Sequence, residues 1–419
     1  MIRITPSLPP RPGRALAATL ALAGLLPALA GAAPTAADRA LTSAEHRVQR
    51  ESSADALIDL ASAFMRKARE IGDSSYYDRA AAALDRALVA EPAHYGALRT
   101  RAWVLLGKHE FANALRAART ARRVQPNDWW NYGNLADACA ELGYYRGATH
   151  ATVRMMALRP GLPAYTRVAA LRALFGDRRG AIEALELALD ASDPSDPEQR
   201  AWILTYLGHE HWALGEVERA ATRYESALAT FPDYHLALPG LARVRAAQGR
   251  TAEAIALYER AVAVLPTPSI AGALGDAQAA SGNPVAARAS YDFAVYMGRV
   301  ATARGRTLGR ELALFLADHD RDLDEAFRLA HAEASVRDDV YTDDALAWVL
   351  FKQGRLPRAK RAIARALRLG TEEASFHYHA ALIAAALGKP RAARRHLRAA
   401  QALAPRVDAA LSHGAPSSS

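Results

Sequence analysis

The sequence predicts an all-α solenoid, a stack of about ten helix-turn-helix units over residues 34–410. Three observations support this fold class. Prolines recur at a fixed interval, apolar residues recur at helical spacing between them, and glycines stand where each helix pair must turn. The 419 residues are too many for one compact core but suit a stack of repeats. Residues 1–33 form a separate leader, and the tail over residues 411–419 is expected to be disordered.

The interval between prolines is the first of these observations. Six prolines mark the ends of successive units, in two runs with a spacing of 34 residues: Pro92, Pro126, Pro160 and Pro194, then Pro232 and Pro266. A fixed period of roughly 20–50 residues indicates an array of identical supersecondary units. Proline falls where a helix must stop, because it lacks a backbone N–H and disfavours helix in the residue before it.

Residues 129–160 show how one unit is built. Leu135 and Cys139 recur at helical spacing and belong to the apolar face of a first helix. Gly143 follows where this helix must turn, because glycine accepts the left-handed conformation. A second helix completes the unit, and its small Ala148 permits a close crossing of the two helices.

This arrangement resembles the tetratricopeptide repeat. One copy carries the motif's residue types in order: Leu204, Leu207, Gly208, Gly215, Ala220, Tyr224, Ala227 and Pro232. The next copy repeats them: Leu238, Leu241, Ala242, Gly249, Ala254, Tyr258, Ala261 and Pro266. With weaker copies and a leading helix near residues 40–50, the resemblance covers nearly all of the chain after residue 33. It implies a right-handed superhelix in which the first helix of each unit lines an inner groove and the second lies outside.

The register of the repeats is least regular between Pro266 and Pro405. Residues 296–309 lack both the closing proline and the usual turn. The first unit carries about seven extra residues between Phe64 and Ala80, which predict a longer turn between its two helices. We therefore expect departures from the regular stack at these places.

The first 33 residues are typical of a secretory signal peptide. Three arginines precede an apolar, uncharged run from Ala15 to Ala30, and small residues then offer A-x-A cleavage after Ala30 or Ala32. The run is short for a membrane-spanning helix, although an uncleaved anchor is the alternative. The single cysteine, Cys139, is far downstream, so it cannot carry a lipid at the cleavage site or form an intrachain disulfide. We expect a periplasmic or secreted protein that is not a lipoprotein.

The resemblance implies which side chains face the inner groove. These positions include, unit by unit, Trp103, Trp130, Asp137, Trp202, Thr205, His209, Trp212, Arg243, Asp276, Tyr341, Asp344, Trp348, Phe351 and Tyr378. Five of the six tryptophans are among them, and tryptophan is enriched at binding hot spots. We expect Trp202, His209 and Trp212 to form the first contact patch for a protein or peptide. The alternative is that several of these residues pack between repeats.

Basic residues are expected on the opposite side. The chain has a formal charge of +9, and residues 351–408 hold thirteen basic residues against three acids. The clusters fall on second helices: Arg358, Lys360, Arg361, Arg365 and Arg368, then Arg391, Arg394, Arg395 and Arg398. On an outward face arginines are most often a solvated surface. No aromatic residues interleave with them, so nucleic acid is not an expected partner.

No motif indicates catalysis, a metal site or a cofactor. The pairs His209/His211 and His377/His379 are two residues apart, so within a helix they point to different faces. The acidic run 318–324 lacks the glycine of a calcium loop, and the sequence has no HExxH, GxSxG or phosphate loop. The leading expectation is a non-catalytic scaffold or adaptor of the cell envelope that binds a protein or peptide segment in the groove. The alternatives are a subunit of an envelope or membrane-associated assembly that uses the arginine-rich outer face, and an enzyme with a site in the groove.

Overall fold

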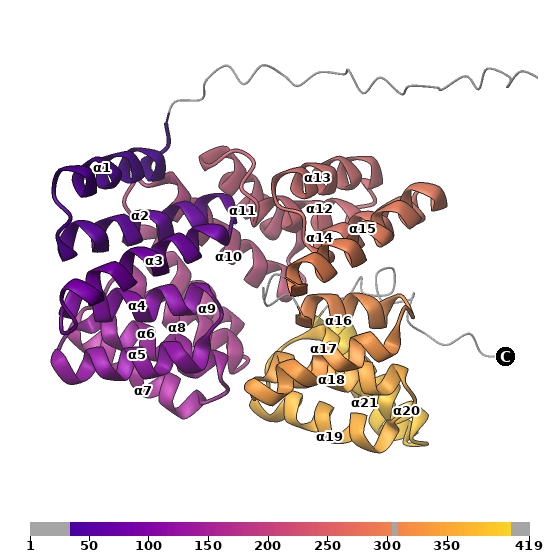
Figure 1. Cartoon of the computed structure of the whole chain (residues 1–419). Coiled ribbons are helices and arrows are strands. Elements are labelled where there is room, and N and C mark those ends of the chain that lie inside the picture. Colours follow the sequence, from indigo (N-terminus) through magenta and orange to yellow (C-terminus); the bar gives the residue numbers. More distant parts are fainter. Residues whose placement is uncertain (1–33, 304–308, 404–419) are drawn as a thin grey trace, which may run out of the picture. The chain divides into compact units, whose positions relative to one another are not determined.

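The computed structural model describes residues 34–303 and 309–403, and the regular elements of these residues are helical (Figure 1). The helices of the first half are α1 (Ala36–Arg50), α2 (Ala54–Ile71), α3 (Ser75–Ala90), α4 (Tyr95–Gly107), α5 (Phe111–Val124), α6 (Trp129–Glu141), α7 (Tyr145–Leu158), α8 (Leu162–Leu174), α9 (Arg178–Asp190), α10 (Pro197–Ala213) and α11 (Val217–Thr230). Those of the second half are α12 (Ala237–Ala247), α13 (Thr251–Val264), α14 (Pro268–Ala280), α15 (Pro284–Ala303), α16 (Gly309–Asp318), α17 (Leu323–Val336), α18 (Val340–Lys352), α19 (Leu356–Ala366), α20 (Ala374–Ala386) and α21 (Pro390–Leu403). The predicted leader (1–33) and tail (411–419) lie outside the described residues.

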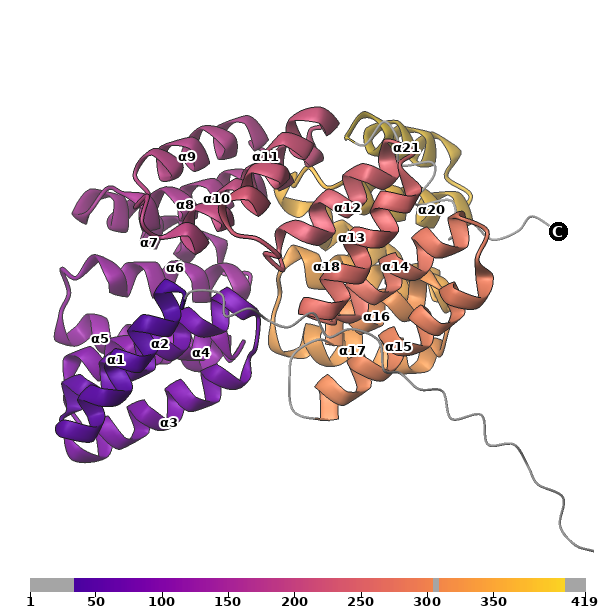
Figure 2. The ribbon, with the colours of Figure 1, turned by 90° about the horizontal axis from the view of Figure 1, so that it is seen from above.

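After the leading helix α1, the helices form ten pairs, from α2–α3 to α20–α21. Successive pairs pack side by side in chain order, and Figure 2 shows the same succession from above. Within the described residues this confirms the predicted all-α stack of about ten units with an additional helix at its start.

The turn inside each pair repeats with nearly constant spacing. In nine pairs, from α4–α5 to α20–α21, the turn contains a residue with positive φ at the same place: His109, Gly143, Gly176, Gly215, Gly249, Gly282, Asp320, Gly354 and Gly388; the α16–α17 turn has a second one, Asp322. These residues are 33 or 34 positions apart, with two longer steps of 39 and 38 residues before Gly215 and Asp320. The left-handed turn thus gives a register for these nine pairs, including those in which the proline ladder is lost.

Extra residues in the sequence lengthen helices rather than turns. In the first pair α2 has 18 residues and the turn is only Gly72–Ser74, so the prediction of a longer turn is wrong there. The helix continues because residues 64–71 include good helix formers and no Gly or Pro before Gly72. Similarly, residues 296–303, where we expected a break, extend α15 to 20 residues.

Small side chains allow the helices of a pair to cross closely. One alanine position of the second helix is fully or almost fully buried in nine successive pairs: Ala80, Ala114, Ala148, Ala181, Ala220, Ala254, Ala287, Ala326 and Ala359. Glycines of the first helices make room for larger rings. A Cβ added at Gly208 or at Gly240 would lie 2.6 or 2.5 Å from the ring of Tyr224, which is itself completely buried. The core is therefore distributed along the stack instead of gathered in one centre.

Candidate binding surface on the first helices

Two positions of the first helix supply most of the predicted contact residues. Six residues before the left-handed turn stand Trp103, Asp137, His209, Arg243, Asp276 and Trp348. Thirteen residues before it stand Trp130, Trp202 and Tyr341. The two positions are two helical turns apart and lie on one side of the helix. We call the surface formed by eight of these residues, all except the buried Trp348, and by their exposed neighbours the first-helix face.

Helix α10 carries an aromatic stripe on this face. The rings of Trp202 and Tyr206 lie 4.2 Å apart between centroids, and Tyr206 is 5.3 Å from His209. The three residues follow one another at intervals of four and three, so they form a line along the helix. Tyr206 is 37% exposed and is absent from the predicted contact residues. The sequence contained a signal for Tyr206, because it stands one helical turn after Trp202. The prediction chose Thr205, the residue beside it, instead.

Carboxylates from different repeats approach the aromatic stripe. Burial raises the pKa of Tyr206, and the charges of Glu141 on α6 and Glu210 on α10 raise it further. Burial also raises the pKa of Tyr341 on α18, and Glu373 and Glu210 contribute to that shift. Tyr341 is 39% exposed. Because α6, α10 and α18 are not neighbours in the stack, side chains from separate repeats share the space beside this stripe.

His209 is held in its neutral form. Its Nδ1 lies 2.7 Å from the hydroxyl of Tyr224, and burial, helped by the charge of Arg243, lowers the pKa of His209 to about 3. The guanidinium of Arg243 lies over the ring of Trp212, 4.7 Å from its centroid. His209 therefore offers an uncharged ring edge at neutral pH, whereas the half-buried Trp212 is partly covered by Arg243.

A second aromatic group lies on α4 and α6. The rings of Trp103 and Trp130 meet edge to face at 5.6 Å, and the guanidinium of Arg99 lies 4.6 Å from the centroid of Trp130. Further along α6, the Asp137 carboxylate accepts a hydrogen bond of 2.5 Å from Nη2 of Arg167. Both tryptophans are half-buried, so they belong partly to the packing between these pairs and partly to the surface.

Three of the predicted contact residues are buried. Thr205 is 0% exposed and its hydroxyl donates to the Ala201 carbonyl within α10. Asp344 and Trp348 of α18 are also buried; the former pairs with Nδ1 of His379 at 2.9 Å. These side chains serve the packing between repeats, the alternative that the sequence left open, because adjacent first helices close over them. They are not part of the exposed first-helix face.

Phe351 lies beside the buried Trp348. The two rings are stacked with centroids 5.3 Å apart, and Phe351 is half-buried. The indole Nε1 of Trp348 donates to Oδ1 of Asp318 at 2.8 Å, and the ring of His379 also stacks on Trp348, with centroids 4.2 Å apart. The aromatic residues of α18 and α20 are thus mostly fixed against one another, with Tyr341 as the exposed member.

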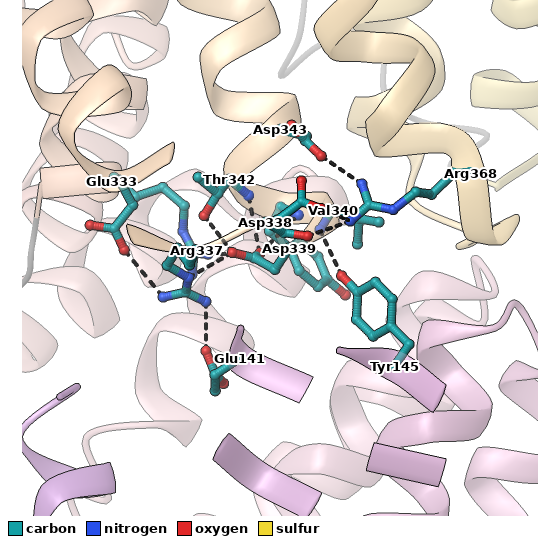
Figure 3. A network of polar contacts seen from close by, with 12 residues as sticks. Glu141, Tyr145, Glu333, Arg337, Asp338, Asp339, Val340, Thr342, Asp343 and Arg368 are labelled. Atoms are coloured by element: carbon teal, nitrogen blue, oxygen red, sulfur yellow. Dashed lines mark hydrogen bonds and ion pairs between the residues drawn. The ribbon is translucent and has the colours of Figure 1, made fainter. Parts of the chain in front are cut away.

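A network of buried charges links the α6–α7 turn to the segment before α18 (Figure 3). Arg337, 5% exposed, donates to Glu141 and to Asp339 at 2.6 Å each, and to Glu333 at 3.2 Å. Glu141 lies on α6, and Arg337 directly follows α17, five helix pairs further along the stack. A buried guanidinium with three carboxylate partners is a satisfied charge, and removal of Arg337 would leave the buried carboxylates of Glu333 and Asp339 without this cation.

Two further contacts join the same parts of the stack. The Tyr145 hydroxyl accepts a hydrogen bond of 2.8 Å from the backbone N–H of Val340. Arg178, also buried, donates to Glu210 at 3.0 Å and to Glu373 at 2.6 Å. Residues about 195 positions apart are therefore bonded directly, so the stack is stabilised by more than contacts between neighbouring repeats.

Within residues 34–303 and 309–403, no group of three His, Cys, Asp or Glu side chains is placed to hold a metal ion. The adjacent histidines of α10 have separate partners, Tyr224 for His209 and Glu216 for His211, at 2.7 Å in each case. None of the helices described within these two ranges is both long enough and apolar enough to span a membrane.

Ten pairs of helices with a turn every 34 residues or so, and aromatic residues repeated on the first helices, define a helical-repeat scaffold in the described part of the chain. The family description of the tetratricopeptide repeat matches residues 207–267, 240–303 and 345–411. These parts of the chain therefore consist of tetratricopeptide repeats. No curated protein sequence gives a significant match.

Several solved structures resemble the chain. The human IFIT1 dimer with m7Gppp-AAAA is 17% identical, aligns over 79% of this chain and 76% of its own, and has a TM-score of 0.51. PilW, titled a widely conserved type IV pilus biogenesis factor, is 15% identical over 50% of this chain and 92% of its own, with a TM-score of 0.42. MamA is 20% identical over 40% and 97%, with a TM-score of 0.34. At these identities the likeness to IFIT1 shows the fold alone.

Proposed function

We propose that the chain is a non-catalytic scaffold of the cell envelope that binds a protein or peptide segment on the first-helix face. Proteins with tetratricopeptide repeats generally mediate protein–protein interactions. The observation that carries the proposal is the stripe of Trp202, Tyr206 and His209 on α10, with Tyr206 exposed. Aromatic side chains that are rigidly held and partly exposed are the residues most often found at binding hot spots.

The state of the polar groups supports a bound segment rather than a chemical reaction. Glu141 is engaged by Arg337, Asp137 by Arg167, and His209 by Tyr224. Groups held in this way are poorly placed to exchange protons with a substrate. The ring faces and hydroxyls of the exposed tyrosines remain for apolar contacts and for hydrogen bonds to a peptide backbone. A preformed surface lowers the ordering cost of binding.

The location in the cell envelope rests on residues 1–33. Their basic start, apolar run and A-x-A sites favour export, as in the bacterial exported tetratricopeptide proteins that the sequence resembles. The test is fractionation of cells that produce the full chain, followed by N-terminal sequencing. A mature protein that begins just after Ala30 or Ala32 in the periplasm or medium supports this part. An uncleaved chain that sediments with membranes would replace it with the anchored alternative.

Binding on the first-helix face can be tested by site-specific crosslinking. A photoreactive phenylalanine analogue at position 206 should give a discrete adduct in extracts of the producing cell. The adduct should disappear when Trp202 is also replaced by alanine, because a hot-spot aromatic contributes about 2 kcal/mol or more to affinity. Tyr296, 61% exposed on α15, gives the matched control: its replacement by alanine should leave the adduct intact. The same photoreactive analogue placed at position 296 should give no such adduct. Equal adducts from the probes at positions 206 and 296 would refute this binding surface.

A further inference from the structure

The second helices of the last two pairs carry positive charge without acidic neighbours. Neither α19 nor α21 contains Asp or Glu. On and beside these helices, seven exposed cations have neither a carboxylate partner nor a place over a Phe, Tyr or Trp ring among the described residues: Lys360, Arg361, Lys389, Arg391, Arg394, Arg395 and Arg398. We call this surface the terminal basic face. It is separate from the first-helix face, so the inference below does not depend on what binds there.

Many arginines on other second helices of this chain are neutralised by carboxylates. Arg223 of α11 pairs with Glu186, and Arg299 of α15 pairs with Glu325. Even on α19, Arg365 pairs with the buried Asp343. Uncompensated cations on two helices at the end of the stack therefore form a concentrated field of one sign, which attracts a partner of opposite charge.

Two of these cations repel each other. The positive charge of Lys360 on α19 lowers the pKa of Lys389, the residue before α21. Both side chains are exposed, so nothing in the fold forces them together through burial. A shared anion between the two ammonium groups would remove their repulsion. Phosphate groups supply such an anion.

We propose that the terminal basic face binds the surface of an anionic phospholipid bilayer. Two observations favour a bilayer over a nucleic acid. No Phe, Tyr or Trp lies on α19 or α21, whereas single-stranded nucleic acids are held by stacking on aromatic rings. Leu397 stands 40% exposed among the arginines and can enter the apolar boundary of a bilayer. Each Lys or Arg at such a surface strengthens binding about fivefold.

Vesicle flotation tests the proposal directly. The chain from residue 34 onward is suitable, because the described residues from Ala36 on belong to one compact unit and the apolar run 15–30, which can itself enter a membrane, is left out. Vesicles of phosphatidylcholine alone should not bind it. Vesicles with about one third phosphatidylglycerol should bind it, and binding should fall steeply when the ionic strength exceeds about 0.5 M.

Matched variants separate this surface from overall charge. One variant reverses the four arginines of α21: Arg391→Glu, Arg394→Glu, Arg395→Glu and Arg398→Glu. The control makes the same charge change on four exposed arginines of α5: Arg116→Glu, Arg119→Glu, Arg122→Glu and Arg123→Glu. We expect the α21 variant to lose at least about a hundredfold in vesicle affinity and the α5 variant to lose at most about fivefold. Circular dichroism melts check that both variants fold.

Three outcomes would overturn the proposal: no flotation of the parent chain with anionic vesicles, equal losses in both variants, or full competition by single-stranded RNA together with loss of RNA binding in the α21 variant. The last would identify a nucleic acid partner. Should the α21 variant fail to fold, Lys360→Gln with Lys389→Gln provides a milder test, for which we expect a loss of about tenfold or more. Unchanged vesicle affinity in that variant would also contradict the proposal.

Discussion

Replacement of Gly143 by alanine should loosen the contact between the α6–α7 turn and the segment before α18. Gly143 has a φ of 79°. A Cβ added there would lie 2.0 Å from the carbonyl oxygen of Asp338 and 2.5 Å from its carbonyl carbon. These are backbone atoms, which cannot turn aside as a flexible side chain does. The segment that carries Arg337 must therefore move away from α6.

The expected loss of stability has two parts. The left-handed conformation costs an alanine about 1 kcal/mol. Displacement of Asp338 weakens the contact of Arg337 with Glu141 and other bonds of the network, which adds about 2–4 kcal/mol. Gly249 is the matched control because its φ is 77° and nothing lies within 4 Å of an added Cβ. Gly249→Ala should show only the first part.

Urea unfolding followed by circular dichroism compares the two variants, and hydrogen exchange locates the effect. Local exchange is needed because a stack of repeats can unfold in parts, so one global transition is not assured. Exchange of the Val340 amide should accelerate in Gly143→Ala and remain as in the parent chain in Gly249→Ala. Equal destabilisation of both variants, with Val340 protected in each, would refute the reasoning.

Three further predictions concern single side chains. Tyr145→Phe removes the acceptor of the buried Val340 N–H and should cost about 1–3 kcal/mol in urea unfolding, whereas Tyr144→Phe, at an exposed site, should cost nothing measurable. His209 should titrate in NMR with a pKa of about 3. Because this pKa lies below the unfolded value, the stability that the neutral ring gives is complete above about pH 6.5 and is lost as the pH falls toward 3. The variant His209→Gln should lack this part of the pH dependence. A His209 resonance that titrates near its ordinary pKa would contradict this. Cys139 is buried, and burial raises the pKa of its thiol, so Ellman's reagent should label it only in denaturant; rapid labelling of the native chain would contradict the burial.

The repeat fold was predictable because its determinants are local. The glycine that turns each pair, such as Gly143 or Gly215, and the buried alanine after it lie within one unit and recur in the next. Even so, the length of α2 was not predicted. Its additional residues are compatible with a helix or with a turn, and only packing against α3 selects the helix.

The surface was less predictable than the fold. Helical spacing placed Trp202 and His209 on one face, but burial of Thr205 and Asp344 depends on how closely neighbouring first helices pack. The bond between Arg337 and Glu141 joins residues 196 positions apart, and no periodic pattern predicts such a pair. These contacts arise from the geometry of the assembled stack, which a single unit does not contain.

The contacts between distant repeats also set an order of events during synthesis. Arg178 leaves the ribosome 195 residues before Glu373, so at about 5–20 residues per second it waits roughly 10–40 s for this partner. During that interval the nascent chain has paired helices whose cohesion comes from adjacent units only. The part of the chain that has emerged by then is therefore a looser form than the finished protein, and release of the last two repeats completes it.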